Sequence, residues 1–235
     1  MPNKLVWDFL PIPMQEEIET LSQTLFSSTL PWQKTIACLL LQRGIHSFKQ
    51  AKEFFNPSLE QLHNPFVMKD MDRAVERILL AIKHKENILI YGDYDVDGTC
   101  SVSILYLFLS KVYPNVSTYV PDRYKEGYGI SFQGIDYAVD NDVSLIITLD
   151  CGIKGHEKVQ YAKEKGIEMI ITDHHTPAET LPEAVAVLNP KRADCTYPYK
   201  ELCGCGIGFK LIQALCKSLQ LPSHTPYEFL DLVAL

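Results

Sequence analysis

From residue 86 onward, short and almost wholly apolar runs alternate with longer segments of helical periodicity. The apolar runs are NILIYGD, VSTYVP, VSLIITLD, IEMIITD and AVAVLNP, and the segments between them include GTCSVSILYLFLSKV, FQGIDYAVDN and KGHEKVQYAKEKG. Strands that are buried on both faces are apolar throughout, and parallel strands need crossover helices between them. The pattern therefore predicts an α/β fold, in which a parallel β-sheet has helices on both faces. The tail, GIGFKLIQALCKSLQ and then TPYEFLDLVAL, is predicted to be helical again.

Residues 1–85 have a different pattern, and we predict that they are helical. WQKTIACLLLQRGI is apolar-periodic and stops at Gly44, and SFKQAKEFFNP starts on Ser47 as a candidate N-cap. MDRAVERILLAIKH has apolar residues at helical spacing from Met71. We therefore expect a helical N-terminal segment over residues 1–85, packed on an α/β domain over residues 86–235. We interpret four aromatic residues as core: Phe54, Phe55, Tyr106 and Phe108.

Composition and charge exclude several classes of protein. The 235 residues are 46% hydrophobic and 22% charged, as in globular proteins, and no apolar run approaches the ~20 residues of a membrane span. The net charge of −7 excludes a broadly basic surface, although a local groove can still be positive. The start, MPNKLVWDFL, has no apolar signal core, so we expect a cytoplasmic protein with reduced thiols.

The seven cysteines include a C-x-C pair, Cys203 and Cys205, with Cys195 nearby. A zinc site would need a second pair at suitable spacing, and the sequence has none. We interpret the cysteines as buried, unreactive thiols.

Acidic and imidazole side chains follow three of the predicted strands. They are Asp93, Asp95 and Asp97 after the first, Asp150 in ITLDCGI, and Asp173, His174 and His175 in ITDHH. Ligands of open parallel sheets bind outside the carboxyl ends of the strands, so we expect these side chains to lie together. Asp97 alone, before Gly98 and a helix, is best explained as a helix cap. Three such strand ends together favour a metal site.

The types of ligand indicate which metal would bind. Carboxylates with one or two imidazoles and no thiolate suit Mn²⁺ or Mg²⁺ better than Fe²⁺ or Zn²⁺. So many carboxylates are better neutralised by two ions, and a two-ion site is the standard device for hydrolysing phosphate esters. An EF-hand loop is excluded because its twelfth position, counted from Asp93, is Ile104 and not Glu, and because the stretch follows a buried strand.

A series of motifs resembles the DHH phosphoesterase superfamily and, within it, the bacterial RecJ exonuclease family. The motifs, in order, are GDYDVDG, EGYGIS at 126–131, ITLDCGI, ITDHH, NPKR at 189–192 and CGCGIGFKL at 203–211. RGI…A…FFNPSL and DMDRAVERI are similar too, so the resemblance covers nearly the whole chain. It implies a metal-dependent phosphodiesterase, a single-stranded-DNA-specific 5′→3′ exonuclease of DNA repair and recombination that uses two Mn²⁺ or Mg²⁺ ions. The implied partners are single-stranded DNA, a single-strand-binding protein and a helicase, and we expect a monomer.

The resemblance also implies residue roles. Asp95, Asp97, Asp150 and His174 would be metal ligands, and Asp150 would bridge the two ions. Asp93 would be a ligand or would hold the ligands in place through hydrogen bonds. His175 would bind metal or the scissile phosphate. Asp173 would be a ligand or would orient the histidines. The implied catalytic set is Asp95, Asp97, Asp150, His174 and His175.

Other side chains are candidates for contact with DNA. Arg123 and Tyr128 in PDRYKEGYG, and Asn189 and Arg192 in NPKR, would contact phosphate or stack on a base, with a solvated loop as the alternative. A predicted helix begins with three glycines: Gly204, Gly206 and Gly208. The free amides at its start would hold a phosphate, or, as the alternative, the glycines would allow tight packing.

Members of the family continue past LDLVAL into a fourth motif with a further Asp ligand, then a DHHA1-like domain and an OB-fold. We therefore expect this chain to be an N-terminal portion that binds metal weakly and is inactive alone. One alternative is a DHH enzyme for short oligonucleotides, cyclic dinucleotides or pyrophosphate, whose first motif usually reads His-x-x-Pro-Asp-x-Asp and not Tyr-Gly-Asp-Tyr-Asp-Val-Asp. Another is a non-catalytic scaffold that has lost ligands, but every metal-motif position present here is intact.

Overall fold

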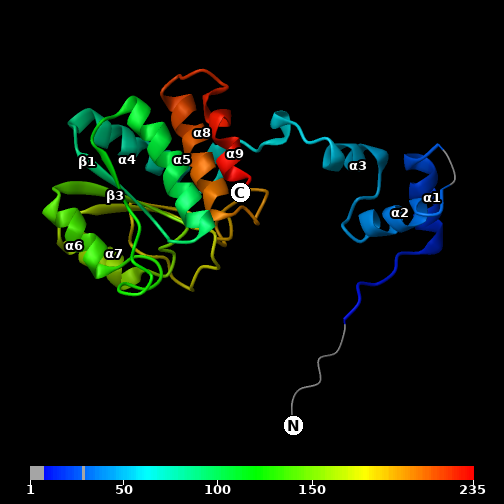
Figure 1. The fold of residues 1–235 in the computed structure, drawn as a ribbon, viewed down its shortest axis with the longest axis horizontal. Helices are drawn as coiled ribbons and strands as arrows, with labels where there is room; N and C mark the ends of the chain where they lie inside the picture. Colours follow the sequence, from blue (N-terminus) through cyan, green and yellow to red (C-terminus); the bar gives the residue numbers. More distant parts are fainter. Residues whose placement is uncertain (1–7, 28–29) are drawn as a thin grey trace, which may run out of the picture. The chain divides into compact units, whose positions relative to one another are not determined.

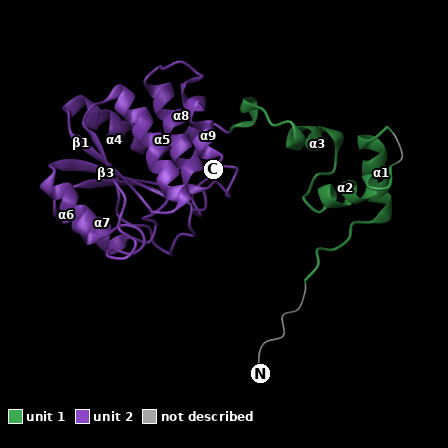
Figure 2. Cartoon of the chain, viewed as in Figure 1, with its two compact units in different colours: residues 1–62 green, residues 63–235 purple. Residues whose placement is uncertain are grey.

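The computed structural model describes residues 8–27 and 30–235 and divides into two compact units, residues 1–62 and 63–235 (Figure 2). The first unit contains helices α1 (Gln15–Leu25), α2 (Gln33–Leu41) and α3 (Phe48–Phe55), followed by a 3₁₀ turn at Leu59–Gln61. Its own small core consists of Ile18, Leu21, Ala37, Leu40, Leu41, Ile45 and Ala51.

The helix boundaries in this unit have local causes. The chain turns at Gly44, where φ is +74°, three residues after α2 ends. Ser47 caps α3, because its hydroxyl oxygen accepts a hydrogen bond from the Gln50 amide. Ala51 is the one buried residue of α3, so Phe54 and Phe55 are exposed and their prediction as core residues is wrong.

The second unit is built on a five-stranded parallel sheet with the strand order β2-β1-β3-β4-β5 (Figure 1). The strands are β1 (Asn87–Gly92), β2 (Val116–Tyr119), β3 (Val143–Leu149), β4 (Glu168–Thr172) and β5 (Ala186–Leu188). From β1 the chain crosses to β2 on one side and then returns to β3 on the other. Ligand sites of such sheets lie where the order reverses, here between β1 and β3.

Helices cover both faces of the sheet, as the sequence predicts (Figure 1). One face packs against α4 (Met71–His84), α5 (Val96–Val112) and α8 (Gly204–Ser218), and the other against α6 (Phe132–Asp140) and α7 (His156–Glu164). Successive strand residues alternate between the faces, so Ile88 and Ile90 join the first core and Leu89 and Tyr91 the second. The chain ends with a 3₁₀ turn at Thr225–Phe229 and helix α9 (Leu230–Val233).

Helix α4 determines where the two units divide. It buries Met71, Ala74 and Ile78 in the same core as α5 and α8, and it follows a 3₁₀ turn at Pro65–Val67. The division therefore falls at residues 62/63, earlier than the expected boundary at 85/86.

Two predictions about buried side chains are corrected by the structure. Tyr106 on α5 is partly exposed, whereas Phe108 is buried as predicted. Cys203 is exposed, and its sulfur accepts a hydrogen bond from the Gly206 amide at the start of α8; Cys38 and Cys100 are half-buried. The four buried thiols are Cys151, Cys195, Cys205 and Cys216.

Among residues 8–27 and 30–235, no helix is both long and apolar enough to cross a lipid bilayer.

Candidate metal centre

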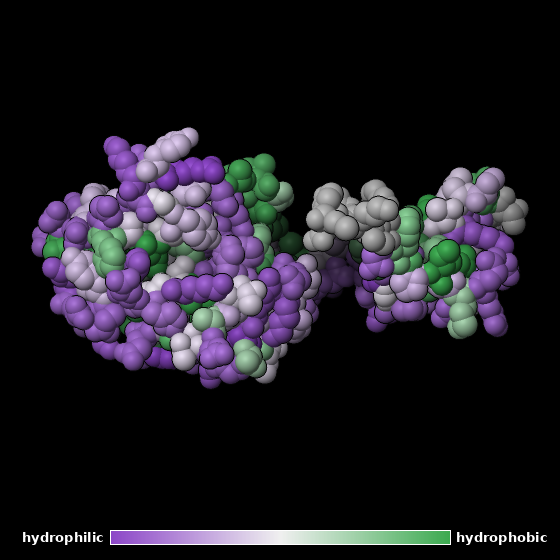
Figure 3. Space-filling view, turned by 90° about the horizontal axis from the view of Figure 1, so that it is seen from below, coloured by the Kyte–Doolittle hydropathy of each residue, from purple (hydrophilic) through white to green (hydrophobic). Residues whose placement is uncertain are grey.

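A row of four buried polar residues lies along the carboxyl edge of the sheet. The last paired residues of β1, β3, β4 and β5 are in register, and the next residue of each strand is polar. These four residues are Asp93, Asp150, Asp173 and Asn189, and none is more than 1% exposed. The parallel register thus places three carboxylates and one amide side by side, although up to 96 residues separate them in sequence. In the unit of residues 63–235, the face seen from below is mostly hydrophilic (Figure 3).

Three carboxylate oxygens of this row lack a hydrogen-bond partner. Both side-chain oxygens of Asp93 and Oδ1 of Asp150 are buried without one. Burial raises the pKa of Asp93, and burial together with the charges of Asp97 and Asp95 raises that of Asp150 to about 8. A buried carboxylate without a donor is unfavourable unless a cation compensates for it, so these oxygens fit a metal ion.

The backbone of Asp150 is itself in a disfavoured conformation. Its φ is +60°, in the left-handed region that residues other than glycine rarely adopt. Its amide donates to the carbonyl of Thr172 over 2.9 Å, and its own carbonyl accepts from the Tyr128 hydroxyl over 3.2 Å. These contacts hold the conformation that places the Asp150 carboxylate at the switch point of the sheet.

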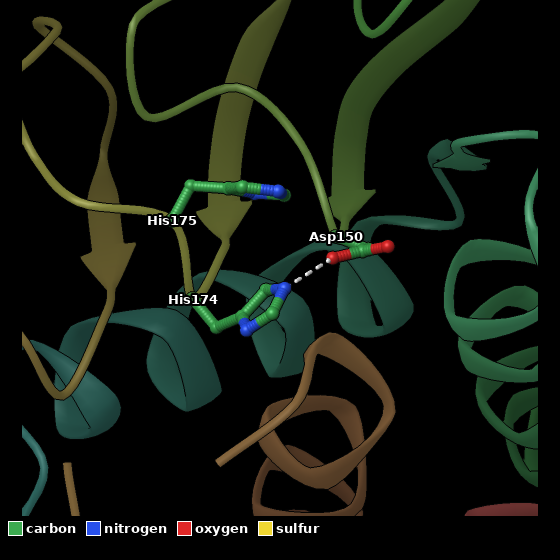
Figure 4. A group of neighbouring side chains, drawn as sticks. All are labelled: Asp150, His174 and His175. Atoms are coloured by element: carbon green, nitrogen blue, oxygen red, sulfur yellow. Dashed lines mark ion pairs between the residues drawn. The ribbon is translucent and has the colours of Figure 1, made fainter. Parts of the chain in front are cut away.

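The two adjacent histidines contact different carboxylates. Figure 4 shows His174 paired with Asp150, and the ring of His175 beside them. His174 Nε2 lies 3.1 Å from Asp150 Oδ1 and 3.7 Å from Asp97 Oδ2, and the Asp150 contact lacks hydrogen-bond geometry. His175 Nδ1 lies 2.7 Å from Asp173 Oδ1, in a hydrogen bond. One ligand atom from each of Asp150, His174 and His175 lies within 4.8 Å of the others, as metal ligands do.

Asp173 connects the histidines to the loop that follows β3. Its Oδ1 accepts from the His175 amide and ring, and its Oδ2 accepts from the Ile153 amide over 2.9 Å. Burial raises the pKa of Asp173, but these hydrogen bonds outweigh burial and hold it below its usual value. The bond to Asp173 in turn raises the pKa of His175. Asp173 therefore fixes the orientation of the His175 ring.

Asp95 and Asp97 both bind amides at the start of a helix, and the cap that Asp97 taken alone would suggest is made by Asp95. Asp95 is the N-cap of α5, because its Oδ1 accepts from the Gly98 amide over 2.9 Å. Asp97 lies in the first turn of α5 and accepts from the amides of Gly204 and Cys205 over 2.7 and 2.6 Å, at the start of α8. Each oxygen of Asp97 keeps a lone pair for a cation.

The glycine at the start of α8 allows this close approach. A Cβ on Gly204 would lie 2.5 Å from the Cβ of Asp150 and 2.6 Å from its Oδ1. The amides of this glycine-rich turn thus bind a carboxylate of the chain itself. Sequence reasoning missed the bond between Asp97 and the α8 amides, since residues 107 positions apart gave no signal for it.

A loop between β2 and α6 brings Tyr128 and Arg123 to the centre. Glu126 shapes this loop from inside, because it accepts hydrogen bonds from Tyr119, Ser131 and the Asp122 amide. The hydroxyl of Tyr128 lies 3.3 Å from His175 Nε2. Its ring contacts that of Tyr94 edge-to-face, and the Arg123 guanidinium lies 5.1 Å from the centre of the Tyr94 ring.

Asn189 and Arg192, the other two candidates for DNA contact, lie in buried structural contacts. The Asn189 side chain donates to the His175 carbonyl over 2.9 Å, so it holds the loop that carries both histidines. Arg192 is 7% exposed and is bound by Asp70, Asp194 and the Val187 carbonyl. The structure therefore brings Tyr128 and Arg123, but not Arg192, to the surface of the centre.

Comparisons with known proteins agree with this geometry. Residues 87–235 match the model of the DHH family, N-terminal domain. The single-stranded-DNA-specific exonuclease RecJ of Bacillus subtilis is 40% identical over 235 residues, which are 100% of this chain and 28% of that protein. The chain thus spans less than a third of this relative.

Two solved structures are also similar. The crystal structure of exonuclease RecJ bound to manganese has a TM-score of 0.65 and 33% identity, over 71% of this chain and 42% of that one. RecJ from Thermus thermophilus in complex with Mn²⁺ has a TM-score of 0.74 and 27% identity, over 100% of this chain and 32% of that one.

Proposed function

Because this chain belongs to the DHH family, we propose that it forms the metal-binding core of a RecJ-type exonuclease. The proposed reaction is the hydrolysis of phosphodiester bonds of single-stranded DNA from the 5′ end, with two Mn²⁺ or Mg²⁺ ions. The observation that carries the proposal is the set of orphaned, buried carboxylate oxygens on Asp93 and Asp150, next to His174. The relatives named for this activity, and the manganese-bound structures, support it.

The residues at the centre divide into ligands and positioning groups. Asp93, Asp95, Asp97, Asp150 and His174 would hold the ions, which supply a hydroxide at neutral pH and stabilise negative charge on phosphorus. Asp173 holds the His175 ring, and Asn189 holds the backbone of the same loop. His175 would contact a phosphate oxygen, and Tyr128 and Arg123, which is exposed, would contact the DNA strand.

Several further features belong to the same proposal. Single-stranded DNA is the proposed substrate, and a helicase and a single-strand-binding protein are the proposed partners because they generate and hold unpaired strands. We propose that the protein acts as a monomer in the cytoplasm.

Metal binding by this chain is the first test. Isothermal titration of Mn²⁺ into the chain is expected to show binding that the Asp150→Asn, His174→Ala variant loses. Asp136→Asn removes an exposed carboxylate on α6, bonded to the Tyr161 hydroxyl, and serves as the matched control. Equal Mn²⁺ binding by all three proteins would contradict the assignment of the centre.

Activity is tested in a chimera in which this chain replaces the corresponding residues of the Bacillus subtilis relative. The substrates are 5′-phosphorylated single-stranded DNA, duplex DNA, a dinucleotide and pyrophosphate, each with Mn²⁺ or EDTA. We expect metal-dependent loss of the single strand, which the double variant abolishes. Cleavage of only the small substrates would favour another DHH phosphoesterase. No cleavage, beside an active unmodified relative, would favour a non-catalytic role.

A further inference from the structure

A cavity of about 470 Å³ lies directly beside the candidate metal centre. Tyr128, Asp173 and His175 line it on the side of the centre, and residues 152–158, the loop between β3 and α7 with the first turn of α7, line it on the other. The cavity and the centre share the His175 ring and the Tyr128 hydroxyl, which lie 3.3 Å apart. A molecule in the cavity would therefore be adjacent to whatever reacts at the centre.

The inner part of the cavity is apolar. Ile130 and Ile153 line it and are almost fully buried, and Gly129 and Gly152 present backbone without side chains. Its volume lies within the range of roughly 300–1,000 Å³ of pockets that hold small organic ligands. An apolar inner wall with an aromatic residue at its edge suits a sugar and a base better than a bare inorganic ion.

The rim of the cavity carries free cationic and hydrogen-bonding groups. Lys154 and His156 are exposed, and within the described part of the chain their side chains have no hydrogen-bond or ion-pair partner. Lys158, by contrast, is occupied by Glu157 at 3.2 Å and by the ring of Phe132. The first amides of α7 also border the rim, and the N-cap, Gly155, has no side chain to bind them.

We propose that this cavity binds one nucleotide unit of the substrate strand, adjoining the phosphodiester that is hydrolysed. Lys154 and His156 hold the phosphate of that nucleotide, and Tyr128 and the apolar wall contact its sugar and base. The inference rests on the proposed function, because it assigns a substrate subsite to the same centre. The loop 152–158 is thus a specificity element of the nuclease, separate from the metal ligands.

The test measures binding without catalysis. Thymidine 5′-monophosphate, thymidine and inorganic phosphate are titrated separately into this chain in EDTA, so that no metal ion holds the phosphate. We expect the nucleotide to bind more tightly than either part alone. Lys154→Gln is expected to weaken nucleotide binding about tenfold, the loss of one charge-assisted contact, and Lys154→Arg to retain most of it. Lys163→Gln, which removes a lysine of α7 that pairs with Glu183, is the matched control and is expected to bind normally.

The outcomes separate this inference from the proposed function. Unchanged nucleotide binding by Lys154→Gln, equal weakening by Lys163→Gln, or no nucleotide binding at all would each overturn the inference. If the chimera hydrolyses single-stranded DNA and Lys154→Gln changes neither its KM nor nucleotide binding, the subsite is wrong and the function stands. If the chimera is inactive but the nucleotide binds through Lys154, the cavity is a nucleotide site and the proposed reaction is wrong.

Discussion

Substitution of Asp150 by Asn is expected to stabilise the metal-free protein. Asp150 is 1% exposed, its Oδ1 has no hydrogen-bond partner, and Asp97 and Asp95 lie close enough to raise its pKa. The pKa rises from 3.8 to about 8, so the folded protein loses stability as the pH rises through that window. The substitution removes this charge and should recover that loss.

The size of the effect follows from the pKa. Each tenfold difference in proton affinity is worth about 1.4 kcal/mol, so a pKa raised to about 8 sets an upper bound of about 6 kcal/mol above pH 8. Relaxation of the protein around a buried charge reduces this energy, so we expect Asp150→Asn to raise the free energy of unfolding by about 2–4 kcal/mol at pH 8. At pH 4 the native carboxyl is protonated, and the difference should nearly vanish.

The assay is urea denaturation in EDTA at pH 4, 6 and 8, for the native protein and the Asp150→Asn variant. Trp32 is the one tryptophan among residues 8–27 and 30–235, and it lies in the first unit, so a change in its fluorescence follows the unfolding of that unit. Circular dichroism follows mainly residues 63–235. We expect the substitution to shift only the circular dichroism transition. With Mn²⁺ at about 100 times its dissociation constant, the native protein alone should gain ~2.7 kcal/mol.

Two results would refute this reasoning. A variant that is less stable than the native protein at pH 8 in EDTA would mean that Asp150 makes a favourable contact without metal. An increase in stability of equal size at pH 4 and pH 8 would mean that packing, and not the buried charge, causes the effect.

Three further substitutions test other features of the structure. Gly204→Ala is expected to weaken Mn²⁺ binding at least tenfold by calorimetry, because its Cβ would overlap Asp150; normal binding would contradict that approach. Asn189→Ala should cost about 0.5–1.5 kcal/mol in urea denaturation, since it removes the hydrogen bond from the buried Asn189 side chain to the His175 carbonyl; a neutral effect would contradict this. Burial lowers the pKa of Lys210 from 10.5 to about 8. Between pH 8 and pH 10.5 the unfolded chain therefore binds more protons than the folded protein, so stability should rise with pH in this range. Lys210→Met should reduce that rise, and an unchanged slope between pH 8 and 10 would refute it.

The sequence predicted the architecture well because the strands carry strong local signals. Runs such as NILIYGD and VSLIITLD are apolar enough to require burial on both faces, and the order of elements then requires a parallel sheet. The acidic strand ends followed directly, since parallel strands share one carboxyl edge. The assignment of each site residue to metal or catalysis stays a prediction.

Long-range contacts were beyond the reach of sequence patterns. The cap of α5 that Asp97 taken alone would suggest is made by Asp95, and Asp97 binds the amides of α8. The sequence suggested that Arg192 is a surface cation. In the structure it is buried and donates hydrogen bonds to Asp194 and to Asp70, which lies 122 residues away in sequence. Spacing along the chain cannot reveal either contact, because both depend on how α4, α8 and β5 pack in three dimensions.

The geometry of the centre depends on strand register, because each of four neighbouring strands contributes one residue to the row: Asp93, Asp150, Asp173 and Asn189. A slip of one residue in a single strand would move its polar side chain ~3.3 Å along the sheet and turn it to the opposite face. An insertion inside β1, β3, β4 or β5 would move one member of the row away from its neighbours. Metal affinity would therefore fall for any variant whose sheet is misaligned, even when its secondary structure content is unchanged. Metal affinity would therefore detect an error of strand register that spectroscopy of the backbone does not detect.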